Sequence, residues 1–84
     1  NKAVYLFTLR TCPYCQEIKF DWEQAKKENP TTQVYEVHAQ MLNRYPIFED
    51  MVKSYPTILR YDNRRFRVFE NSRTIDNFSL FMKK

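Results

Sequence analysis

Glycine is absent from all 84 residues of this chain, and its absence restricts the turns that the chain can form. Average usage of about 7% would supply about six glycines. Turns that need a positive φ angle must instead use Asn, Asp or a strained residue, because a Cβ atom makes this region sterically costly. The absence also excludes the glycine-based binding motifs, namely the phosphate-binding P-loop, the GxGxxG dinucleotide turn and the EF-hand loop.

The length and composition predict a single domain covering residues 1–84. Typical domains have about 100–150 residues, so two will not fit. The content of 43% hydrophobic and 17% aromatic residues is too apolar for a disordered tail. No apolar run reaches the roughly 18–20 residues of a membrane-spanning helix, so we expect no membrane partner. Because the chain begins at Asn1 rather than at Met, we allow that the domain was excised from a longer chain.

Charge gives a weaker constraint on function. Fourteen Lys and Arg residues against ten Asp and Glu residues give a net charge of +4. The densest cluster of basic residues fits either a solvated strand and turn or a surface that attracts an anionic partner such as glutathione or nucleic acid. No nucleic-acid recognition motif accompanies the charge, so we predict no nucleic-acid binding. The cluster consists of Arg60, Arg64, Arg65 and Arg67.

Hydrophobic patterning predicts four strands and three helices. Short runs of apolar and β-favouring residues mark the strands, and apolar residues spaced three and four apart mark the helices. The predicted strands cover residues 3–8, 33–38, 57–61 and 65–69. The predicted helices begin at Pro13, Pro46 and Ile75 and end before Asn29, before Pro56 and at Met82, and the second includes Met51 and Val52.

The element order βαβαββα predicts an α/β fold with a four-stranded mixed sheet flanked by helices. The first two strands are joined through a helix, so they should be parallel with a right-handed crossover. The last two strands are separated by a short turn at Asp62 and Asn63, which predicts an antiparallel hairpin.

Both cysteines lie together in Cys12-Pro13-Tyr14-Cys15, at the junction between the first strand and the first helix. Positions i and i+3 of a first helical turn bring the two Cβ atoms to one side, close enough for a disulfide. Cys12 should occupy the N-cap, where free backbone N–H groups and the helix dipole favour thiolate over thiol. Cys15 lies one turn further along the apolar face, so we expect it to be less exposed and to remain a thiol.

This arrangement predicts thiol–disulfide exchange, because a thiolate is the attacking group in that reaction. Cys12 should attack a substrate disulfide, and Cys15 should resolve the mixed disulfide. A structural zinc site needs about four ligands, whereas the chain offers two cysteines and the distant His38, so we expect no metal. Two inert core cysteines are the alternative, although a CxxC near a βαβ pattern is typical of a thioredoxin-like redox motif.

A Cys-Pro-Tyr-Cys motif and a Tyr55-Pro56 pair before the third strand also give the chain a resemblance to a known superfamily. The sequence resembles thioredoxin-fold thiol–disulfide oxidoreductases over nearly its whole length, and CPYC is the tetrapeptide typical of dithiol glutaredoxins. The resemblance implies that Pro56 forms a cis peptide bond facing the cysteines. It also implies that the Tyr55 backbone is free to bind a peptide or glutathione, in a groove bordered by Pro13 and Tyr14.

The two halves of the chain resemble different members of this superfamily. Glutaredoxins usually carry Lys or Arg three residues before the first cysteine, where this chain has Leu9, so the adjacent Arg10 is the candidate to contact substrate. Glutaredoxins also hold glutathione with a Gly-Gly turn, whereas residues 70–74 lack glycine and resemble the turn before the last thioredoxin helix. The missing glycines thus fall at turns 62–63 and 71–72, and the C-terminal half is more thioredoxin-like than the active site.

These features predict a small enzyme, a dithiol–disulfide oxidoreductase acting on protein disulfides or glutathione mixed disulfides. We expect no bound cofactor; glutathione is the expected reductant or co-substrate, with a dedicated reductase as the alternative electron donor. Two binding functions stay open, namely a thioredoxin-like module of a larger protein and a glutaredoxin-like dimer that carries an iron–sulfur cluster through Cys12. We expect a monomer in the cytoplasm, although an oxidising compartment also fits.

Overall fold

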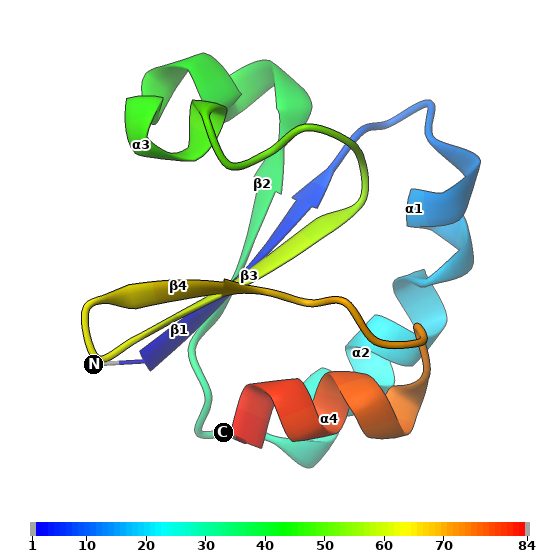
Figure 1. Ribbon diagram of the computed structural model, residues 1–84. Helices are drawn as coiled ribbons and strands as arrows, with labels where there is room; N and C mark the ends of the chain where they lie inside the picture. Colours follow the sequence, from blue (N-terminus) through cyan, green and yellow to red (C-terminus); the bar gives the residue numbers. More distant parts are fainter. Residues whose placement is uncertain (1, 84) are drawn as a thin grey trace.

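A computed structural model describes residues 2–83 of the chain (Figure 1). Helices flank both faces of a central sheet, as predicted from the order of the elements. The strands are β1 (Lys2–Thr8), β2 (Val34–His38), β3 (Thr57–Asp62) and β4 (Arg65–Val68). The helices are α1 (Pro13–Glu17), α2 (Lys19–Glu28), the 3-10 helix η1 (Ala39–Arg44), α3 (Pro46–Glu49) and α4 (Ile75–Lys83).

The sheet contains four strands in the order β2-β1-β3-β4. Strand β1 pairs parallel with β2 and antiparallel with β3, and β3 and β4 form an antiparallel hairpin. These pairings confirm the predicted mixed sheet. Leu6 is paired with Glu36 and Thr8 with His38. Because side chains alternate between the faces of a sheet, these four side chains share one face.

The first predicted helix is divided in two. Helices α1 and α2 meet at Ile18, which has φ −83° and ψ −7°. The chain stays coiled across this junction, since the Trp22 amide donates a hydrogen bond to the Ile18 carbonyl at 2.8 Å. Both side chains are buried in the core beneath the junction. The predicted apolar face is therefore preserved although the helix is not continuous.

The second predicted helix is shorter than expected. Helix α3 ends at Glu49, so the prediction that Met51 and Val52 belong to it was wrong. The Val52 amide still donates to the Phe48 carbonyl at 3.0 Å, which makes this segment a turn continuing from α3. The preceding 3-10 helix η1 was not predicted, and β4 ends at Val68, one residue earlier than expected.

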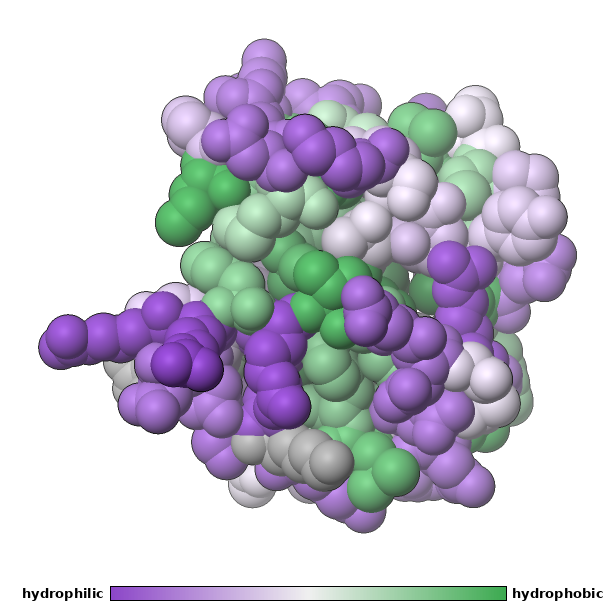
Figure 2. Space-filling model, in the orientation of Figure 1, coloured by the Kyte–Doolittle hydropathy of each residue, from purple (hydrophilic) through white to green (hydrophobic). Residues whose placement is uncertain are grey.

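Each face of the sheet carries its own hydrophobic cluster. Helices α2 and α4 pack on one face, where the Trp22 and Phe78 rings meet edge to face with centroids 5.1 Å apart. Helix α3 packs on the other, where Phe48 meets Phe7 with centroids 5.0 Å apart. Figure 2 shows hydrophobic side chains in the middle of the viewed face, between hydrophilic ones at its edges. No helix in residues 2–83 is long and apolar enough to cross a membrane.

The β3–β4 hairpin contains a tight turn with positive φ angles although the chain has no glycine. Asn63 has φ 55° and Arg64 has φ 64°. Asn is the residue expected at such a position, because it tolerates the left-handed region better than most residues. Arg64 was not expected there and carries the steric cost that a Cβ atom has in this region. Elsewhere in the described chain no residue has a positive φ, so the turn at residues 71–72 does not need one.

The basic cluster is not the continuous surface that the sequence suggested. Arg60 is only 1% exposed, and its Nη2 donates to Asp62 Oδ2 at 2.7 Å. Arg60 alternates with Leu59 along β3 and therefore faces the layer that contains α4, whereas Arg64, Arg65 and Arg67 are exposed. Interpreting Arg60 as part of a solvated cluster was wrong, because the sequence does not reveal which face the last helix covers.

Candidate functional site

The two cysteines lie where β1 has ended and α1 begins, and both are free thiols. Cys12 occupies the N-cap of α1 with an extended backbone, at φ −85° and ψ 115°. Its Sγ accepts a hydrogen bond from the Cys15 backbone N–H at 3.3 Å. Pro13 at the first helical position has no N–H to satisfy and a φ angle suited to the helix. The local sequence thus aims a backbone donor at the Cys12 sulfur.

The Tyr55–Pro56 segment, which precedes β3, contacts Cys12. The peptide bond between Tyr55 and Pro56 is cis. The Cys12 thiol donates a hydrogen bond to the Tyr55 carbonyl at 3.4 Å, and Pro56 is buried. Of the other residues assigned to a substrate groove, Pro13 and Tyr14 follow Cys12 in α1 and are exposed, and Tyr55 is half-buried.

The two thiols differ in their acidity. The pKa of Cys12 is lowered, first because the Cys15 side chain hydrogen-bonds to its sulfur; burial opposes this effect. The backbone N–H groups of Cys15 and Tyr14 and the positive charge of Arg73 lower it further. Burial raises the pKa of Cys15, and its interaction with Cys12 adds to this, while the Leu9 backbone and Arg73 act in the opposite direction. The shifts favour Cys12 as the thiolate.

Exposure does not distinguish the two thiols. Cys12 and Cys15 are each 8% exposed, so the expectation that Cys15 is the less exposed of the pair was wrong. The physical reason is that the Tyr55–Pro56 segment covers Cys12, which the local helix position did not reveal. Arg73 was also missed as a charge near the pair. It lies in the loop before α4, far from Cys12 along the sequence, and no local pattern could have placed it.

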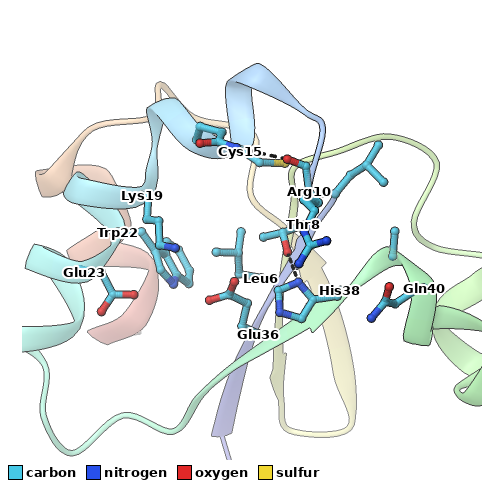
Figure 3. A pocket seen from close by; sticks show the side chains of 13 residues that line it. Leu6, Thr8, Arg10, Cys15, Lys19, Trp22, Glu23, Glu36, His38 and Gln40 are labelled. Atoms are coloured by element: carbon cyan, nitrogen blue, oxygen red, sulfur yellow. Dashed lines mark hydrogen bonds between the residues drawn. The ribbon is translucent and has the colours of Figure 1, made fainter.

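A cavity of about 350 Å³ opens on the Cys15 side of the pair (Figure 3). It is formed between β1, β2 and the α1–α2 segment, and Cys12 is not among the residues that form its wall. Arg10 lies here, with its carbonyl accepting a hydrogen bond from Gln16 Nε2 at 3.1 Å. The wall also includes Thr8, whose Oγ1 lies 3.1 Å from His38 Nδ1. Figure 3 shows Arg10 and His38 together on one side and Lys19 and Glu23 on the other.

The arrangement can support redox chemistry of the thiol pair. Within residues 2–83, no group of three or more His, Cys, Asp or Glu side chains is placed to hold a metal ion. The chemistry available to these residues is thiol–disulfide exchange, in which one thiolate attacks a disulfide sulfur and the other sulfur leaves as a thiolate, with Cys12 as the more acidic thiol.

Several solved structures are similar to this one. The J-Trx1 fragment of ERdj5 gives a TM-score of 0.83 at 17% identity, and the match covers 95% of this chain and 39% of that one. An uncharacterised thioredoxin-like protein from Clostridium perfringens gives a TM-score of 0.77 at 17% identity, covering 98% and 68%. The chain has a thioredoxin fold. The zinc-bound form of human ERp44 gives a TM-score of 0.72 at 20% identity, covering 98% and 25%.

The extent of these matches limits what they establish about this thioredoxin-fold chain. It spans 39% of the ERdj5 fragment and 25% of the ERp44 chain. No protein-family model matches the chain, and no curated protein sequence matches it. The similarity establishes the fold alone.

Proposed function

We propose that the chain is a thiol–disulfide oxidoreductase that acts through Cys12 and Cys15. The observation that supports this most is the N-cap position of Cys12, whose sulfur accepts the Cys15 N–H at 3.3 Å. Backbone donors at a helix start stabilise a negative charge, and a thiolate is the reactive form of cysteine. The neighbouring Cys15 thiol can then close a disulfide within the same helical turn.

The reaction takes place in two exchanges. The Cys12 thiolate attacks one sulfur of a substrate disulfide, the substrate S–S bond breaks, and the other substrate sulfur leaves as a thiolate. Cys15 then loses its proton and attacks the Cys12 sulfur, which forms the Cys12–Cys15 disulfide and releases the remaining substrate sulfur. The substrate gains two electrons from the protein, and each released thiolate takes a proton from solvent.

We propose glutathione as the reductant that restores the dithiol. Two glutathione thiols would supply the two electrons and form glutathione disulfide. The CPYC tetrapeptide supports this choice, since it resembles that of dithiol glutaredoxins. Residues 70–74 favour protein disulfides as the oxidised substrates, because this segment lacks the Gly-Gly turn with which glutaredoxins hold glutathione.

Turnover of insulin and of a glutathione mixed disulfide, measured with glutathione as electron donor, tests the proposal. Cys12→Ser should abolish turnover of both substrates, because a hydroxyl does not replace the attacking thiolate. Cys15→Ser should retain the first exchange and accumulate a covalent adduct at Cys12, visible by mass spectrometry of the intact protein.

The pair of serine variants forms a matched test, since each removes one sulfur with little change in volume. Full turnover by Cys12→Ser would overturn the assignment of the attacking group. Absence of turnover by the wild-type chain with glutathione would overturn glutathione as the reductant, and absence of turnover also with dithiothreitol as electron donor would overturn the proposed enzyme function. Faster turnover of insulin than of the glutathione adduct would support protein disulfides as the substrates.

A further inference from the structure

The second exchange requires a proton acceptor for Cys15, and the cysteine pair does not supply one. Cys15 must lose its proton before or during its attack on Cys12, and burial raises the pKa of its thiol. A nearby base would therefore accelerate this step. Cys15 belongs to the wall of the 350 Å³ cavity, which is large enough to hold water. The base should thus be sought among the other groups in this wall.

Two side chains of β2 enter the same cavity. Glu36 and His38 are paired with Leu6 and Thr8 of β1, which places them on the sheet face that carries α1 and α2. Both residues line the cavity and are exposed to solvent. His38 has a fixed neighbour, because its Nδ1 lies 3.1 Å from the hydroxyl of the buried Thr8.

We propose that His38 is the proton acceptor for Cys15 in the resolving step. The inference depends on the proposed function, because it assigns a residue to the second exchange. In the tautomer whose Nδ1–H donates to Thr8 Oγ1, the Nε2 lone pair is free to take a proton. The proton passes from Cys15 Sγ through solvent in the cavity to Nε2, while the Cys15 electron pair forms the bond to Cys12. The bond from Cys12 to the substrate breaks, and the substrate sulfur leaves as a thiolate.

Imidazole suits this role better than the neighbouring carboxylate does. A general base is most effective when it exchanges protons near the working pH, and histidine does so in the neutral range. A carboxylate such as that of Glu36 is usually a weaker base at this pH. The other charged groups that face the cavity are Arg10 from the β1–α1 loop and Lys19 and Glu23 from α2.

The test follows single turnover of the reduced, full-length chain with an equimolar amount of dithionitrobenzoate. The first equivalent of coloured thiol reports attack by Cys12, and the second reports resolution by Cys15. His38→Asn retains an amide near the position of Nδ1, so it can keep the Thr8 hydrogen bond, but it removes the basic nitrogen. We expect the first phase to change less than about twofold and the second to slow by at least about tenfold, the low end for a lost general base.

The pH profile separates this role from a structural one. At neutral pH the second phase should be faster in the wild type than in His38→Asn, because only the wild type has the basic nitrogen. His38→Asn should approach the wild-type rate only at alkaline pH, where the Cys15 thiol, whose pKa is raised by burial, ionises by itself. Added imidazole should restore the second phase of the variant without affecting the first.

Two further variants give the controls. Thr8→Val should slow the second phase less than His38→Asn does, because it removes the orienting hydroxyl but leaves the base. Glu36→Gln should leave both phases within about twofold of the wild type if the imidazole is the base. A slowed second phase in Glu36→Gln together with an unchanged one in His38→Asn would overturn the inference and assign the carboxylate.

The outcomes also separate the two proposals. A wild type that releases only one equivalent of coloured thiol would overturn the disulfide-forming function and the role of His38 with it. A wild type that releases both equivalents, with an unchanged rate and pH profile in His38→Asn, would overturn only the inference about His38. Equal slowing of both phases in that variant, without rescue by imidazole, would also overturn it.

Discussion

Asn29 joins the end of α2 to α4, and its replacement by Ala should destabilise the fold without altering the reactivity of the thiols. Its side chain is buried, with 7% exposure, and its Nδ2 donates to the Ala25 carbonyl at 2.8 Å and to Ser79 Oγ at 2.7 Å. Ser79 Oγ in turn donates to Glu28 Oε1 at 3.2 Å. The network links residues that are distant in sequence, and the Glu28 carboxylate is its only ionisable group.

The size of the effect follows from the bonds that are lost. Each of the two hydrogen bonds contributes about 0.5–1.5 kcal/mol to the free energy of unfolding. The Ala25 carbonyl lies in the last turn of α2, where carbonyls have no donor within the helix, so Asn29→Ala leaves it unpaired. We therefore expect a loss of about 2 kcal/mol, which lowers the Tm of a domain of this size by about 8–16 °C.

Urea denaturation of reduced wild type and variant, followed by circular dichroism, measures this loss. Asn43→Ala is the matched control, because Asn43 is exposed on η1, and its free energy of unfolding should differ by less than about 0.5 kcal/mol. The rate of Cys12 alkylation should be the same in all three proteins, since Asn29 lies at the far end of α2. A loss below about 0.5 kcal/mol for Asn29→Ala would refute the reasoning from the buried hydrogen bonds.

Three further predictions concern the thiols and the hairpin. The pH midpoint of Cys12 alkylation by iodoacetamide should lie below the value of about 8.5 for a free thiol, and that of Cys15, measured in Cys12→Ser, should lie above it. Arg73→Gln should raise the Cys12 midpoint, and added salt should reduce the difference from wild type, because the effect of Arg73 is electrostatic. Arg64→Gly should raise the free energy of unfolding by about 0.5–1 kcal/mol in urea titrations, since glycine adopts the left-handed region freely and Asn-Gly favours such turns; a decrease would contradict this account.

The sheet could be predicted because each strand carries its own signal in the sequence. Alternation along residues 65–69 and the adjacent turn were sufficient to indicate a hairpin, and a helix between the first two strands was sufficient to predict that they are parallel. The N-cap position of Cys12 was equally local, since it depends only on a strand ending where a Pro13-led helix begins.

Features that depend on contacts between distant segments could not be predicted in this way. The burial of Arg60 depends on which face α4 covers, and the equal exposure of the two cysteines depends on the Tyr55–Pro56 segment. The same applies to His38, which the sequence leaves as an isolated residue at the end of a strand. Only the parallel register with β1 brings it beside Thr8 and into the cavity of Cys15.

The thioredoxin fold places the two thiols in different surroundings. This difference explains why Cys12 is expected to attack and Cys15 to resolve, which their equal exposure does not explain. Cys12 faces the Tyr55 carbonyl and the charge of Arg73, whereas Cys15 lines a cavity with both apolar and charged walls that Cys12 does not line. A change on the first side should therefore alter the attack on the substrate, and a change on the second should alter resolution. Because Arg73 also acts on the pKa of Cys15, its replacement should affect both steps, while His38 should affect only the second.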